Sequence, residues 1–161
     1  MSIISKERIA HMHGVAEFMF KHADKFDCKY LTKEELYHLG LVHDIGYLSG
    51  KEDHESNGAD LFEYGSIMHS CIYYHGLTPQ EYMKNTCCYG IEDIPEELIL
   101  LWLADMKVLS TGDDAGKVVS FTEKLNEIAS YYGEDSVPYE ICRDTIDWLS
   151  TNIEMANAME E

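Results

Sequence analysis

The chain has 161 residues, which suits one domain with a sizeable core, and 45% of them are hydrophobic, as in folded globular proteins. Thirty Asp and Glu oppose twelve Lys and Arg, which leaves a net charge of −18. Such a surface repels nucleic acids and anionic membranes, so we expect neither as a partner. No apolar run reaches the roughly 18 residues of a membrane span.

The cysteines and the charge also bear on location and substrate. Five cysteines form no CxxC pair and no signal peptide is visible, which predicts a cytoplasmic protein with reduced thiols. The negative charge disfavours a polyphosphate substrate unless local positive charge is supplied. Bound metal ions are one source of such charge.

Helical signals follow one another along nearly the whole chain. Capping boxes predict helix starts at Thr32, Thr78 and Ser120, and prolines predict starts near 95 and 138. The expected helices cover about 6–26, 33–47, 55–64, 66–75, a short segment from 79, 95–109, 121–133 and 138–153.

Polar loops are expected at 50–53 and 110–117, and no segment alternates as a strand would. The sequence therefore predicts an all-α fold and one domain over residues 1–161. The C-terminal helices, about 120–155, should pack on the same core, and the acidic tail after them should fray.

Metal-competent polar groups interrupt the apolar faces of four predicted helices. Residues three or four apart share a helix face, and by this spacing the inward groups are His11, His43, Asp44, His75 and Asp105, with His54 at the start of a further helix. A single histidine on an apolar face is usually a hydrogen-bonded core residue. Six such groups would need many unrelated partners, whereas one metal centre satisfies all of them. Imidazole and carboxylate without thiolate suit Fe, Mn, Zn or Co better than Ca or Mg alone.

Five segments resemble, in order, the motifs of the HD superfamily of metal-dependent phosphohydrolases. They are RIAHMHGV (8–15), HDIG (43–46), HESNGA (54–59), IYYH (72–75) and LADMK (103–107). The match extends over about residues 8–110 and implies a compact helical bundle of the HD type. Tyr47 stands where many members have lysine, and an arginine typical of the family after the closing aspartate is missing.

The two additional histidines are similar to those of the binuclear branch, which includes bacterial hydrolases of symmetrical dinucleoside tetraphosphates. By that resemblance one ion would be held by His11, His43, Asp44 and Asp105. The second would be held by Asp44, His54 and His75, so that Asp44 bridges the two. The implied ions are divalent Fe or Mn, with Co, Ni or Zn as further candidates.

The resemblance implies hydrolysis of a phosphoester or phosphoanhydride in a small nucleotide-like substrate by a metal-bridging hydroxide, which Asp44 would orient. Arg8 and Lys51 are candidate phosphate contacts because few cations lie near the motifs; a surface or structural charge is the other interpretation of each. Three alternatives stay open: a di-iron oxygenase of the same superfamily, a non-catalytic metal- or ligand-binding domain, and a single-ion site with His54 and His75 as substrate contacts. The sequence does not predict the oligomeric state.

Overall fold

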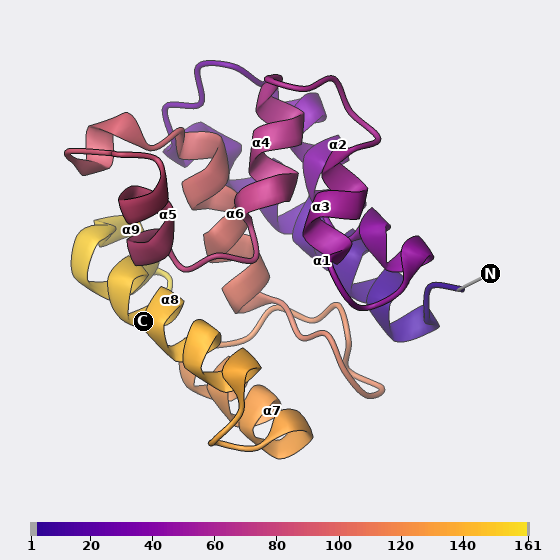
Figure 1. Cartoon of the computed structure of the whole chain (residues 1–161). Coiled ribbons are helices and arrows are strands. Elements are labelled where there is room, and N and C mark those ends of the chain that lie inside the picture. Colours follow the sequence, from indigo (N-terminus) through magenta and orange to yellow (C-terminus); the bar gives the residue numbers. More distant parts are fainter. Residues whose placement is uncertain (1–2, 161) are drawn as a thin grey trace.

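Residues 3–160 are the part of the chain that this computed structural model describes, and most of them are helical (Figure 1). The α-helices are α1 (Lys6–His22), α2 (Lys33–Val42), α3 (His54–Ala59), α4 (Ile67–Tyr74), α5 (Pro79–Asn85), α6 (Glu96–Lys107), α7 (Phe121–Tyr132), α8 (Val137–Asn152) and α9 (Glu154–Ala158). Three short 3-10 helices are η1 (Ala23–Lys25), η2 (Ile45–Ser49) and η3 (Ile91–Asp93). Within residues 3–160 the only β pairing is an isolated bridge between Val108 and Val118, so the predicted all-α fold is confirmed.

Side-chain caps begin most of the helices. At Thr32 and Ser120 the predicted capping boxes are complete, with both reciprocal hydrogen bonds formed. At Thr78 the hydroxyl accepts from the backbone N–H of Glu81 and donates to the Glu81 carboxylate at 3.1 Å, so only half of the predicted box forms. These caps place the helix starts close to where the sequence predicts them.

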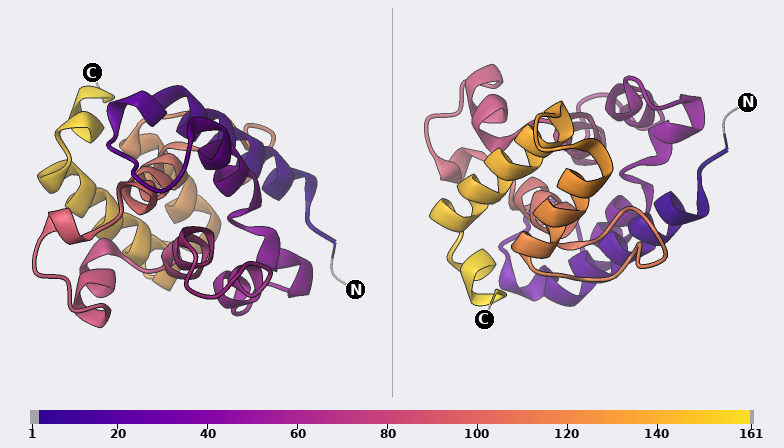
Figure 2. Two further views of the ribbon diagram at one scale, coloured as in Figure 1. Left: turned by 90° about the horizontal axis from the view of Figure 1, so that it is seen from above. Right: turned by 90° about the horizontal axis from the view of Figure 1, so that it is seen from below.

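Helix α6 is the central element of the core. All of its residues from Leu98 to Ala104 are buried, because an apolar side chain occupies nearly every position after the first turn. Two views show the remaining helices arranged around it (Figure 2). α1 and α4 contact α6 on one side, and α7 and α8 contact it on the other. One continuous hydrophobic cluster extends from Val15 in α1 to Leu149 in α8.

The helix predicted to reach Tyr47 ends at Val42 instead, and the chain continues as η2. The reason lies at Gly46, whose backbone approaches α3 so closely that a Cβ atom there would overlap the carbonyl oxygen of His54. A continuous α2 would carry the chain away from this contact. The break turns His43 and Asp44 toward α3 and α4.

The acidic tail differs from the expectation that it frays. Residues 154–158 form α9, and Ala156 is fully buried. The Glu160 carboxylate pairs with the buried ammonium of Lys107 and accepts the backbone N–H of Phe121 at 2.7 Å. An ion pair with a buried partner therefore fixes the tail against α6 and α7. Among the described residues, no helix is both long enough and apolar enough to span a bilayer.

Candidate metal centre

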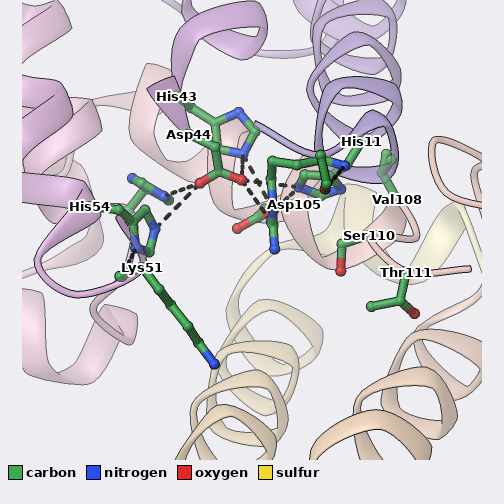
Figure 3. Close-up of polar contacts among 12 residues, drawn as sticks. His11, His43, Asp44, Lys51, His54, Asp105, Val108, Ser110 and Thr111 are labelled. Atoms are coloured by element: carbon green, nitrogen blue, oxygen red, sulfur yellow. Dashed lines mark hydrogen bonds and ion pairs between the residues drawn. The ribbon is translucent and has the colours of Figure 1, made fainter. Parts of the chain in front are cut away.

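Six side chains from five segments of the chain converge at one site, and Figure 3 labels all of them except His75. They are His11 from α1, His43 and Asp44 from the turn after α2, His54 from the start of α3, His75 from the end of α4, and Asp105 from α6. Four of them are almost completely buried, while the side chains of His54 and Asp105 keep 14% and 20% of their exposure. The structure thus brings together all six residues that the sequence singles out.

The four histidines share one orientation. Each Nδ1 atom lies within hydrogen-bond distance of a backbone carbonyl: 3.2 Å to Leu109 for His11, 2.7 Å to Gly40 for His43, 3.2 Å to Lys51 for His54 and 2.6 Å to Ile72 for His75. A carbonyl only accepts, so each Nδ1 carries the proton and donates it. Nε2 then faces the centre of the cluster, which is the orientation that a metal ligand requires.

Asp44 lies between two pairs of histidines. Its Oδ2 atom is 3.3 Å from Nε2 of His43 and 3.8 Å from Nε2 of His11. Its Oδ1 atom is 3.2 Å from Nε2 of His75 and 3.4 Å from Nε2 of His54. The two oxygens therefore face different ligand groups. We call His11, His43 and Asp105 with Asp44 Oδ2 the first group, and His54 and His75 with Asp44 Oδ1 the second group.

The donor spacing fits metal coordination. Donors about 2.1 Å from a shared ion lie roughly 3.0–3.4 Å apart at octahedral or tetrahedral angles. In the first group, Asp105 Oδ1 lies 2.8 Å from Nε2 of His11 and 3.6 Å from Nε2 of His43. Three contacts of Asp44 lie at 3.2–3.4 Å, and the fourth, to Nε2 of His11, is longer at 3.8 Å.

The electrostatics of the cluster also call for a cation. Nε2 of His43 is buried and has no hydrogen-bond partner among the described residues, and such an atom in a folded protein requires an explanation. Burial opposes protonation of His43, but Asp44 and Asp105 raise its pKa to about 10. Burial alone would raise the pKa of Asp44, yet the imidazoles of His43, His54 and His75 lower it well below its usual range. The carboxylates thus favour positive charge where Nε2 of His43 points, and a metal ion supplies it without a proton.

The two predicted phosphate contacts lie at different distances from the cluster. Arg8 donates to Asp44 Oδ2 at 2.9 Å, and its guanidinium lies 4.4 Å from the centre of the Tyr47 ring. Lys51 is exposed, and its amine extends away from the histidines to 5.3 Å from the ring centre of Tyr132 (Figure 3). Its backbone carbonyl, in contrast, orients His54.

Glu55 also belongs to the cluster, although the sequence did not predict it. Its Oε1 atom lies 3.3 Å from Nε2 of His54, and His54, Glu55 and His75 offer ligand atoms within 4.8 Å of one another. The side chain rests on Gly76, where a Cβ atom would overlap it. The available signals were its place next to His54 and the glycine directly after His75.

The other histidines lie apart from the centre. His13 and His38 are exposed, and the ring of His22 packs 4.4 Å from that of Phe18. His69 lies on α4 as His75 does, but its ring stacks on Tyr73 at 6.0 Å. For His13 and His69 this separation agrees with their helical spacing from His11 and His75.

A cavity of about 310 Å³ opens onto the cluster. One wall carries His11, Asp44, His54, His75 and Asp105. The opposite wall comes from α7 and α8 and includes Ile128, Tyr132 and Ile141. Arg8, Lys51 and Lys124 line the same cavity, so three of the twelve Lys and Arg of this acidic chain gather around it. Asp44, Glu55 and Asp105 line it as well, so its lining has as many carboxylates as cations.

Searches of protein-family models, curated proteins and solved structures found no match to this chain. What the site can do is therefore inferred from its own geometry. That geometry comprises overlapping sets of buried histidine and aspartate side chains that could hold metal ions.

Proposed function

We propose that this protein is a metal-dependent phosphohydrolase of the HD type that cleaves a phosphoester or phosphoanhydride bond in a small, nucleotide-like substrate. The observation that carries the proposal is the division of the Asp44 carboxylate, with Oδ2 facing His11 and His43 and Oδ1 facing His54 and His75. A carboxylate shared in this way suits two divalent ions side by side. The order of the motifs along the chain supports the same reading.

The two groups of ligands would hold one ion each, with Asp44 between them. When bound, such a pair supplies a hydroxide nucleophile at neutral pH and offsets negative charge on the phosphoryl oxygens. The protein's own part is to keep each Nε2 lone pair directed inward through the Nδ1 hydrogen bonds. No protein side chain needs to act as the nucleophile.

Arg8 and Lys51 would bind the phosphate groups that do not react. The Arg8 guanidinium is already at the rim of the cluster, 2.9 Å from Asp44, where it also holds this carboxylate in position. Lys51 lies further out in the same cavity, beside Tyr132. The apolar side chains of α7 and α8 would pack against the organic part of the substrate and exclude water from the reacting end.

Metal analysis of freshly purified protein, followed by a phosphate-release assay on a panel of nucleotides with Mn²⁺, Fe²⁺, Co²⁺ and Mg²⁺, tests this function. We expect two ions per chain and metal-dependent release of phosphate or a nucleotide. One ion per chain would favour the single-ion site, with His54 and His75 as substrate contacts. Iron retention with redox-dependent O₂ consumption and no phosphate release would favour the oxygenase. Absence of metal after gentle purification and after addition of Mn²⁺ or Fe²⁺ would refute the proposal.

A further inference from the structure

His11 is oriented differently from the other three histidines of the cluster. His43, His54 and His75 each donate to a carbonyl three residues earlier in the chain, so the backbone directly before each of them sets the direction of its ring. His11 donates to the carbonyl of Leu109, 98 residues away. The direction of its Nε2 lone pair therefore depends on the segment that follows α6.

That segment, the 108–118 loop, folds back on itself and lies against α1. Its backbone pairs at Val108 and Val118, and the Leu109 carbonyl also accepts the N–H of Gly116 at 2.8 Å. Gly116 has a φ of +94°, and a Cβ atom there would lie 2.6 Å from the carbonyl oxygen of Ala10. The loop thus touches the backbone of α1 one residue before His11.

Two buried side chains of α7 hold the start of this loop. The Glu127 carboxylate accepts the N–H of Ser110 at 2.8 Å and the N–H and hydroxyl of Thr111, both at 2.9 Å. The Lys124 amine donates to the carbonyl of Val108 at 2.8 Å and lies 3.0 Å from Glu127. These contacts bracket Leu109 on both sides (Figure 3 shows Val108, Ser110 and Thr111 beside His11). The side chains of Lys124 and Glu127 are only 4% and 9% exposed.

We propose that Lys124 and Glu127 are positioning residues for the metal centre: they fix the Leu109 carbonyl, which directs His11 toward the first ion. The inference rests on the two-ion site proposed above and concerns only its first group. The second group has no comparable link, because its histidines are oriented by Lys51 and Ile72. Removing the pair should therefore weaken one ion and spare the other.

The test is a stepwise Mn²⁺ titration of Lys124→Met/Glu127→Gln by calorimetry. Changing both residues avoids leaving one buried charge without its partner. The step that disappears in His11→Ala identifies the first ion. We expect this step to weaken about 10- to 100-fold in the double variant, as is typical when a residue that orients a metal ligand is lost, and the other step to change less than about threefold. Equal weakening of both steps, or of neither, would overturn the positioning role.

Glu97→Gln is the matched control. Glu97 is as buried as the α7 pair, and its carboxylate accepts the backbone N–H groups of Tyr30 and Leu31 at 2.7 and 3.2 Å, much as Glu127 accepts those of Ser110 and Thr111. Its partners, however, do not orient a ligand. We expect this variant to lose stability while both Mn²⁺ steps stay unchanged.

Hydrogen exchange on the wild-type protein provides a test that needs no variant to fold. Coupling between two sites is reciprocal, so Mn²⁺ binding should slow exchange of the Ser110 and Thr111 amides more than that of the Tyr30 and Leu31 amides. Equal slowing, or none, would overturn the inference. Wild-type protein that binds no Mn²⁺ would refute the proposed function together with this inference. Two bound ions without phosphate release would refute the hydrolase alone and leave the positioning role intact.

Discussion

Oδ1 of Asp44 lies 3.2 Å from Nε2 of His75, although 31 residues separate them in the sequence. His54 faces the same oxygen at 3.4 Å, whereas His11 and His43 face the other oxygen. This contact joins the second group to the first through a single side chain. Variants of the second group should therefore affect one ion without releasing the other.

His54→Ala and His75→Ala should each lower occupancy of the second ion and leave the first in place. Each change removes a neutral nitrogen donor from one group only, while the four donors of the other group remain. Metal content per chain, measured after gel filtration, should fall from two toward one. His69→Ala is the matched control, because His69 lies on α4 as well but stacks on Tyr73 outside the cluster. Full metal content and activity in both variants would show that the assignment to two ions is wrong.

Glu55→Gln should weaken the second ion by less than His75→Ala does. The carboxylate oxygen is 3.3 Å from Nε2 of His54, close enough to contribute a negative charge or a ligand atom, but the side chain is 29% exposed and solvent screens it. Mn²⁺ affinity of the second site should fall about 3- to 10-fold, within the range for groups around a metal ligand. Glu52→Gln, an exposed acidic neighbour, serves as the control. Unchanged affinity in Glu55→Gln would place Glu55 outside the coordination sphere.

Metal loading should raise the thermal midpoint of unfolding. An ion that binds only the folded chain at 100 times its Kd stabilises it by about 2.7 kcal/mol, which for a chain of this size corresponds to roughly 5–10 °C. The reason is the buried Nε2 of His43 and the two carboxylates that favour a cation. Scanning fluorimetry with and without Mn²⁺, and after chelation, measures the shift. Calcium should give less, since imidazole ligands do not suit it. Identical midpoints in all conditions would argue against a metal centre.

Gly46→Ala should destabilise the fold and disturb the second group together. A Cβ atom at Gly46 would overlap the carbonyl of His54, so η2 and α3 would have to separate. Overpacking of this kind costs about 1–3 kcal/mol, and the shift of α3 would move the His54 ring. Urea denaturation should show the loss of stability, and metal analysis should show a weaker second ion. A variant with normal stability and two ions would mean that the η2–α3 contact is more tolerant than its geometry indicates.

Helical periodicity and capping residues predicted the fold class and the helix starts because both depend on local sequence. Periodicity also placed His11 and Asp105 on inward faces of their helices. The break after Val42 was not predicted, because it depends on the approach of Gly46 to α3, a contact between segments that no local pattern encodes. The same holds for the tail, where Glu160 pairs with Lys107. Long-range contacts, steric at Gly46 and ionic at Glu160, thus account for the elements that the sequence misjudged.

The site likewise combines features that local sequence predicts with features that depend on long-range contacts. The six ligand-type residues could be predicted because each combines a metal-competent side chain with an inward position. Glu55 was not predicted because its carboxylate comes close to His54 and His75 only in the folded chain. There it occupies the space that a side chain at position 76 would fill. Lys51, expected as a phosphate contact, has its amine beside Tyr132, and its role in the cluster comes from its carbonyl. Backbone groups carry no sequence signature, so such contributions appear only in the structure.

Asp44→Asn is the most direct test of the shared carboxylate. The amide keeps the size of the side chain and one oxygen, but it removes the charge that two neighbouring cations need. We expect loss of both ions, or a fall in kcat of at least about 100-fold, equivalent to roughly 2.7 kcal/mol of barrier. Asp105→Asn should affect mainly the first ion, because Asp105 faces only His11 and His43.

The two variants are measured in parallel for metal content and phosphate release. Without metal, Asp44→Asn should melt lower than wild-type protein, because the lowered pKa of Asp44 means that its pairing with the imidazoles and with Arg8 at 2.9 Å outweighs its desolvation in the folded chain. With Mn²⁺, the wild type should be stabilised and Asp44→Asn should not, so the difference between the two melting temperatures should widen when metal is present. Normal turnover in Asp44→Asn with both ions retained would exclude a bridging carboxylate. The adjacency of His43 and Asp44 would then have to serve the packing of the turn after α2.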